Sequence, residues 1–251
     1  MKVRFLLSIA VLSALFFAAC NQETPAPTTV PQPTKVKTMV DTSVRAELFE
    51  DPHSYSREES KVTHLDWEAA VDFKKEVITA TAVWTLEEGH GDTVIFDIKD
   101  LEVNEVMVDG SRALFTIQGS DPLLGSALVV PAPGAQSISI LYTTSPEAEA
   151  LQWYPAELTQ GKRQPFLFTQ SQAILARTWV PCQDRPGVRF TYEATVKVPK
   201  ETLALMSASN PTQKNEEGIY EFSMPQPIPS YLLALGVGDL AFIPLGERSG
   251  V

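Results

Sequence analysis

The feature that most constrains the fold is a succession of short β-patterned runs from residue 61 onward. The run KVTHLDWEAAVDF (residues 61–73) alternates strictly, which would place Val62, His64 and Asp66 on one face and Thr63, Leu65 and Trp67 on the other. Runs rich in valine, isoleucine and threonine follow, with turn signals between them, and no convincing amphipathic helix interrupts them. One of these signals, Asp109–Gly110, predicts a hairpin turn. We expect about eight to ten strands in one all-β domain, a β-sandwich or bent sheet spanning residues 37–251.

The first nineteen residues have the organisation of a signal peptide. Lys2 and Arg4 form a positive n-region, and FLLSIAVLSALFFA (residues 5–18) forms an apolar segment too short to span a bilayer as a helix. The segment ends in FFAAC, which resembles a bacterial lipoprotein cleavage box, with Phe17 in place of the usual leucine. We therefore predict a signal peptide at residues 1–19 and lipidation of Cys20. The alternative is an ordinary secretory signal cleaved nearby, with Cys20 incidental.

A tether is predicted at residues 20–36. The stretch NQETPAPTTVPQPTK (residues 21–35) contains four prolines among threonine and glutamine, a composition that cannot form a packed core. Asn21 directly after the cysteine resembles the outer-membrane default of Gram-negative lipoproteins. We expect an exported lipoprotein, anchored to the membrane and facing the periplasm or the cell surface. Cys182 is the only other cysteine, so a lipidated Cys20 leaves no disulfide within the chain.

Charge and motif content exclude several functions for this chain alone. A net charge of −11 without a basic stripe argues against nucleic-acid binding. The three histidines, His53, His64 and His90, have no metal-binding spacing, and H-E-x-x-H, G-x-S-x-G and phosphate-binding glycine motifs are absent. We therefore predict no catalytic residue and no metal ligand here, and we interpret His64 as a structural histidine in a strand.

Several blocks of the sequence, in order, resemble one known family. They are DPHSYS (51–56), TSPEAEALQW (144–153), PFLFTQSQA (165–173), PCQD (181–184), VPKETLALMSA (198–208) and PIPSYLLALGVGDL (227–240). Together they resemble the N-terminal domain of the leukotriene A4 hydrolase-like zinc aminopeptidases, peptidase family M1. The resemblance implies a saddle-like β-domain that precedes a zinc-binding catalytic domain and a helical domain. None of the catalytic-domain motifs occurs here, and GERSGV (246–251) resembles the junction before that domain. We therefore expect the N-terminal portion of such an enzyme, either a fragment or a natural truncation.

The resemblance also nominates substrate-binding residues. In the family, the loop matching residues 169–173 reaches into the active-site cleft and contacts the peptide. Carried over by position, Gln170 and Gln172 are the predicted substrate-binding side chains, with Ser171 between them in backbone contact. Without the resemblance, the same glutamines would be interpreted as caps of turns between strands. Ser171 replaces a cysteine of the vertebrate hydrolase, so the resemblance does not settle pocket shape or epoxide hydrolysis.

The neighbouring residues are predicted to be structural. We expect Cys182 to be a buried, unreactive small side chain. Asp184 and Arg185 should fix the loop through turn hydrogen bonds and an ion pair. Core or interdomain packing is predicted for the four tryptophans, Trp67, Trp84, Trp153 and Trp179.

The sequence is compatible with two functions. The first is a domain that contributes to the substrate pocket of a zinc aminopeptidase; zinc belongs to the complete enzyme, and the partners are the peptide, the missing catalytic domain and the membrane. The second is a non-catalytic, lipid-anchored β-sandwich binding module. The second predicts a polar surface where the first predicts an apolar face that the catalytic domain would cover.

Overall fold

The computed structural model describes residues 51–246 and 249–250, and nearly all regular structure in them is β. This confirms the all-β prediction, although the number of strands exceeds the expected eight to ten because several are only two to four residues long. The strands are β1 (Val62–Asp72), β2 (Val77–Leu86), β3 (Thr93–Ile98), β4 (Glu102–Val108), β5 (Ser111–Arg112), β6 (Thr116–Asp121), β7 (Gly125–Pro131), β8 (Ser137–Thr143), β9 (Leu151–Tyr154), β10 (Phe166–Thr169), β11 (Arg189–Lys197), β12 (Leu203–Met206), β13 (Ile219–Pro229), β14 (Leu235–Gly238), β15 (Pro244–Gly246) and β16 (Ser249–Gly250). Three single 3-10 turns accompany them: η1 (Ala156–Leu158), η2 (Ala176–Thr178) and η3 (Ser230–Leu232).

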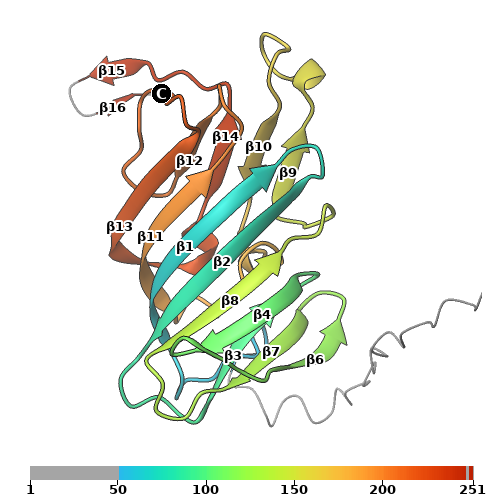
Figure 1. Ribbon diagram of the computed structural model, residues 1–251, viewed down its shortest axis with the longest axis vertical. Helices are drawn as coiled ribbons and strands as arrows, with labels where there is room; N and C mark the ends of the chain where they lie inside the picture. Colours follow the sequence, from blue (N-terminus) through green and yellow to red (C-terminus); the bar gives the residue numbers. More distant parts are fainter. Residues whose placement is uncertain (1–50, 247–248, 251) are drawn as a thin grey trace, which may run out of the picture. The chain divides into compact units, whose positions relative to one another are not determined.

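The largest element is a mixed seven-stranded sheet in the order β13-β11-β1-β2-β8-β4-β5 (Figure 1). Its pairs are antiparallel except β1 with β11, which run parallel. One face is buried, as at Leu65 and Trp67 of β1, and the other carries exposed side chains such as Asp66 and Glu68. This half-buried alternation is what a sheet covered on one side requires.

The start of β1 departs from the strict alternation predicted from the sequence. Val62 is buried with Leu65 and Trp67, whereas Thr63 is exposed. The pairing of β1 with β2 shifts register between Val62 and His64, a β-bulge that resets which side of the strand faces inward. The predicted placement of Val62 and Thr63 was therefore wrong, and that of the residues from His64 onward was right.

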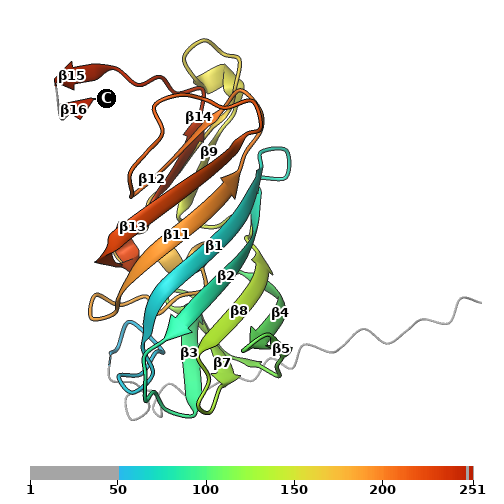
Figure 2. The ribbon, with the colours of Figure 1, turned by 60° about the vertical axis from the view of Figure 1, so that its left-hand side comes forward.

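Two smaller sheets pack with the seven-stranded sheet around one core. The four-stranded sheet has the order β12-β14-β10-β9 and the three-stranded sheet the order β3-β7-β6. Figure 1 and Figure 2 place the four-stranded sheet toward one end of the long strands and the three-stranded sheet toward the other. One hydrophobic cluster joins all three sheets, with Leu65 of β1, Leu128 of β7 and Val237 of β14 among its fully buried members. A further pair, β15 and β16, forms a two-stranded sheet.

Tryptophans form much of this core, as predicted. Trp67, Trp84 and Trp179 are fully buried, and Trp153 is partly buried against the same cluster. Trp67 and Trp179 meet edge to face with ring centroids 5.4 Å apart, a favourable aromatic geometry.

The predicted hairpin turn at Asp109 and Gly110 is confirmed. It joins β4 to β5, with φ of 46° at Asp109 and 76° at Gly110, the positive values that a type I′ turn needs. In the part of the chain that the structure describes, no helix is long and apolar enough to cross a membrane. The predicted signal peptide (1–19), tether (20–36) and lipidated Cys20 lie outside that part and stay predictions.

Candidate functional site

The predicted substrate-binding segment continues directly from β10. This strand lies between β9 and β14, and its buried Leu167 faces the core while Phe166 and Phe168 face the opposite side. The backbone N–H of Gln170 donates to the carbonyl oxygen of Ala150 at 2.9 Å, which extends the pairing one residue beyond the strand. By the two-residue period of a strand, Gln170 follows Phe166 and Phe168 on the outer face, and it is exposed.

Ser171 and Gln172 turn the chain away from the sheet. Ser171 is only 3% exposed, and its hydroxyl donates to the carbonyl oxygen of Leu233 at 2.9 Å. Gln172 is exposed, and its backbone N–H donates to Oε1 of Gln170 at 3.2 Å. The structure thus brings the two glutamines together at the surface, while the serine hydroxyl is used inside the fold. The Gln170 contact is a local turn bond, whereas the carboxamide of Gln172 has no partner among the described residues.

A buried ion-pair network lies in the loop that follows this segment. Arg177 is fully buried, and its Nε lies 3.1 Å from Oδ2 of Asp184. Its other nitrogens donate to the carbonyl oxygens of Leu124 at 2.9 Å and His53 at 2.7 Å. Burial alone would lower the pKa of Arg177, but the carboxylates of Asp97 and Asp184 outweigh that effect and raise it. The guanidinium is therefore a permanent charge that joins four segments of the chain.

Two carboxylates complete the network. Asp184 accepts from the hydroxyl of Ser230 at 2.6 Å through Oδ1. Asp97 accepts from the backbone N–H of Asp184 at 2.8 Å and from that of Tyr55 at 2.7 Å. Burial raises the pKa of Asp97, although Arg177 opposes this shift. Sequence reasoning missed Arg177 and Asp97; the only available signal was a charged residue inside an apolar run, as in AILARTWVP (173–181).

The ion pairs of residues 184 and 185 take partners that the sequence did not indicate. Asp184 pairs with Arg177, and Arg185 pairs with Glu58, with 2.8 Å between Nη1 of the arginine and Oε1 of the glutamate. The backbone N–H of Arg185 also donates to the carbonyl oxygen of Gln183 at 2.9 Å. Both residues therefore fix the loop as predicted, but through two separate ion pairs.

Cys182 is buried as predicted. It forms an isolated antiparallel bridge with Asp97. Burial raises the pKa of its thiol well above the ordinary value, and the carboxylates of Asp184 and Asp97 add to the shift. The thiolate that would react or bind a metal is therefore disfavoured.

No group of three or more histidine, cysteine, aspartate or glutamate side chains in residues 51–246 and 249–250 is arranged to hold a metal ion. His64 instead contacts the hydroxyl of Thr191, 2.7 Å from Nδ1, and His90 contacts the carbonyl oxygens of Gly91 and Ala135 at 2.6 and 2.7 Å. These histidines, each bonded to neighbouring hydroxyl or carbonyl groups, do not fit a zinc ion.

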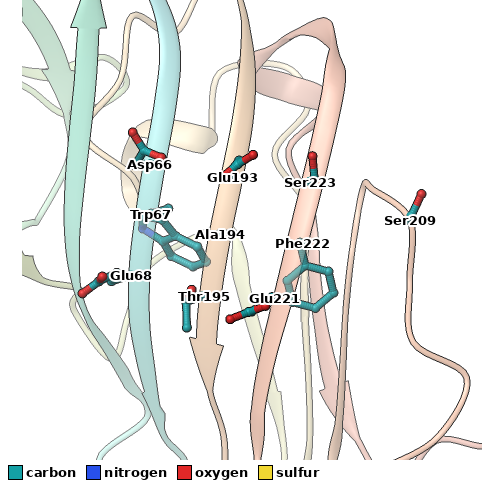
Figure 3. Close-up of a pocket in the computed structure, with 10 residues that line it drawn as sticks. All are labelled: Asp66, Trp67, Glu68, Glu193, Ala194, Thr195, Ser209, Glu221, Phe222 and Ser223. Carbon is teal, nitrogen blue, oxygen red and sulfur yellow. The ribbon is translucent and has the colours of Figure 1, made fainter.

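A second surface feature is a shallow acidic depression on the exposed face of the seven-stranded sheet (Figure 3). Asp66 of β1 stands directly opposite Glu193 of β11, and the depression is lined further by Glu68, Glu221 and Ser209. Its carboxylates come from three strands, so no local sequence pattern indicates it. Nothing in the depression singles out a ligand.

The sequence profile of the Peptidase M1 N-terminal domain matches residues 55–232. This chain belongs to peptidase family M1. Leukotriene A-4 hydrolase of Xenopus laevis is 37% identical over 215 residues, which are 80% of this chain and 35% of that protein. Leucine aminopeptidase 2 of Saccharomyces cerevisiae is 34% identical over 198 residues, 76% of this chain and 29% of that protein. The chain thus spans about a third of the length of these M1 relatives.

Solved structures agree with the family assignment. Native leukotriene A4 hydrolase of Saccharomyces cerevisiae has a TM-score of 0.71 at 30% identity over 84% of this chain and 35% of that one. An M1 zinc metallopeptidase of Deinococcus radiodurans, solved with a Tyr-Ser-Ala substrate, has a TM-score of 0.56 at 19% identity over 78% of this chain and 47% of that one. The second likeness shows the fold. The predicted family and fold are confirmed.

Proposed function

We propose that this M1 N-terminal domain lines one side of the substrate pocket of a zinc aminopeptidase, which removes N-terminal residues from peptides. The observation that carries the proposal is the segment at the end of β10, where Gln170 and Gln172 are exposed while Ser171 between them is buried. A rigid support with two outward carboxamides is what recognition of a flexible peptide needs.

The chemistry of the two side chains suits this role. A carboxamide offers both donors and an acceptor and carries no charge. It can therefore bind the backbone of a peptide without taking part in proton transfer. Catalysis, and the zinc that this family implies, would belong to the catalytic domain of the complete enzyme, because the described residues offer no group that could hold the metal.

An apolar row beside Gln170 supports the presence of such a domain. The rings of Tyr154 and Phe168 stack with centroids 5.9 Å apart, and Phe166 lies 5.8 Å from Phe168. Tyr154 is 38% exposed. On β14, Gly238 leaves space for this row, since a Cβ there would come within 2.8 Å of Phe166. A stand-alone binding module predicts a polar surface here, so the aromatic row favours a face covered by the catalytic domain.

The test uses a protein that joins this chain to its catalytic domain. Removing one carboxamide hydrogen bond costs about 0.5–1.5 kcal/mol, so Gln170→Ala and Gln172→Ala should each raise KM for a peptide substrate about two- to tenfold. Because the glutamines take no part in proton transfer, kcat should change little. Gln118→Ala is the matched control, since Gln118 is exposed on the three-stranded sheet. An unchanged KM in both glutamine variants would contradict the proposal that these residues line the substrate pocket.

We propose in addition that Cys20 carries a lipid that anchors the protein to a membrane, with the outer membrane as the expected location. The FFAAC box and the proline-rich residues 21–35 support this proposal. Growth with an alkyne-labelled fatty acid should label the protein, and Cys20→Ser should abolish the label and release the protein from the membrane fraction. Labelling that persists in the Cys20→Ser variant would contradict it.

A further inference from the structure

A series of buried hydrogen bonds made by side chains leads from the seven-stranded sheet to residues 170–172, the glutamine segment. Trp67 donates its indole N–H to the hydroxyl of Tyr142 at 2.9 Å, and this hydroxyl donates to the carbonyl oxygen of Trp179 at 2.9 Å. The indole N–H of Trp179 then donates to the hydroxyl of Ser171 at 3.1 Å, and Ser171 donates to the carbonyl oxygen of Leu233 at 2.9 Å. The series thus passes through Ser171, the residue between the two glutamines, and ends at Leu233.

The direction of every bond in this series is fixed by chemistry. An indole N–H can only donate and a carbonyl oxygen can only accept, so each hydroxyl must accept once and donate once. Burial raises the pKa of Tyr142, so its hydroxyl keeps the proton that it donates. Trp67, Tyr142, Trp179 and Ser171 are all buried, so a missing bond would not be replaced readily by solvent.

The same side of the segment is held at a second point. The hydroxyl oxygen of Thr169, two residues before Ser171, accepts from the backbone N–H of Leu235 at 2.9 Å. Thr169 and Ser171 therefore attach the segment inward on both sides of Gln170. The carbonyl oxygen of Ser171 also accepts from the backbone N–H of Leu175 at 2.9 Å, which closes the turn after Gln172.

We propose that Ser171 is a positioning residue whose hydroxyl sets the orientation of Gln170 and Gln172. It acts by joining Trp179, in the core, to Leu233, on the neighbouring segment. Without it, the indole N–H of Trp179 and the carbonyl oxygen of Leu233 lose their partners in a buried site, and the turn relaxes to satisfy them. The role in substrate binding rests on the proposed function above; the role in orientation does not.

The orientation can be tested on the full chain by NMR with 15N labelling. In Ser171→Ala, the indole N–H of Trp179 should exchange with solvent about tenfold faster, the change expected for loss of a hydrogen bond worth about 1.4 kcal/mol. The side-chain amide signals of Gln170 and Gln172 should shift. The indole signal of Trp84, which bonds to the carbonyl oxygen of Pro181, should not change.

Two further variants keep this test decisive. Ser126→Ala removes a hydroxyl that bonds to Gly119 at 3.0 Å on the three-stranded sheet, and should leave the glutamine signals unchanged. Ser171→Cys keeps the size and a weak donor, so it should give an intermediate effect and serves if Ser171→Ala does not fold. Glutamine and Trp179 signals that stay unchanged in the Ser171 variants would overturn the proposal.

The kinetic measurement separates this proposal from the proposed function. In the protein that contains the catalytic domain, Ser171→Ala should raise KM with kcat nearly unchanged, as for the glutamine variants. If the signals shift but peptide kinetics do not, Ser171 positions the glutamines and the pocket role fails. If KM rises while the glutamine signals stay fixed, the positioning proposal fails.

Discussion

Nε of Arg177 lies 3.1 Å from Oδ2 of Asp184, and both side chains are completely buried. Through the other contacts of Arg177 and Asp184, this pair joins the segment before β1, the three-stranded sheet, the loop after β10 and η3. The loop that follows the glutamine segment is therefore held by a polar centre as well as by an apolar core.

Arg177→Met should destabilise the domain strongly. The substitution leaves the carboxylates of Asp184 and Asp97 buried without their cation, a change that typically costs about 3–5 kcal/mol. Urea unfolding followed by tryptophan fluorescence measures the free energy of unfolding. Arg112→Met is the control, because Arg112 pairs with Glu105 at the surface, where such a pair contributes about 0–1 kcal/mol. An equal decrease in the free energy of unfolding in the two variants would contradict the assigned role of the network.

Two glycines with the same backbone conformation should respond differently to alanine. Gly125 and Gly89 have φ of 74° and 78°, so each alanine costs about 1–2 kcal/mol from the backbone alone. At Gly125 a Cβ would also overlap the carbonyl oxygen of Ile98 and meet Lys99, whereas at Gly89 it meets no atom within 4 Å. Gly125→Ala should therefore lower the free energy of unfolding by more than Gly89→Ala. Similar losses would show that the close approach at Gly125 relaxes freely.

The turn at Asp109 should make the free energy of unfolding depend on pH. The pKa of the Asp109 carboxyl is held below its ordinary value by hydrogen bonds from two backbone N–H groups. The bond from Ser137 has the larger effect, and that from Gln136 follows. A carboxyl with a lowered folded-state pKa stabilises the fold above the unfolded-state pKa, about 3.9. That stabilisation is lost as pH falls through the lower folded-state pKa. Asp109→Asn should therefore be less stable than the parent chain at pH 7, and the difference should shrink on acidification below about pH 4. A difference in urea midpoint that is independent of pH would contradict this.

Much of the fold was predictable because its physical signals are local. Alternating strands identified the all-β class, and the Asp109–Gly110 pair identified its turn. The β-bulge between Val62 and His64 was not predictable, since an inserted residue leaves the composition of a strand unchanged. Short strands such as β5 and β12 were missed because two to four residues give too little alternation to recognise.

The candidate site was predictable only in part, and for a different reason. The resemblance pointed to Gln170 and Gln172, and the structure places both at the surface. It could not reveal that the Ser171 hydroxyl joins Trp179 to Leu233, because Ser171 and Leu233 are 62 positions apart in the sequence. Glu58, which pairs with Arg185, was hidden for the same reason, because pairing between distant residues leaves no trace in sequence spacing. The carbonyl groups of His53 and Leu124 that accept from Arg177 were hidden in the same way, whereas Asp184 lies only seven residues from Arg177.

The most direct test of the central claim is a joint measurement of bound zinc and aminopeptidase turnover. It compares the purified chain ending at Val251 with a protein that also contains the catalytic domain. The account predicts that the chain alone binds no stoichiometric zinc and does not hydrolyse aminoacyl anilides, and that the longer protein does both. Stoichiometric zinc together with peptide cleavage by the chain alone would contradict it.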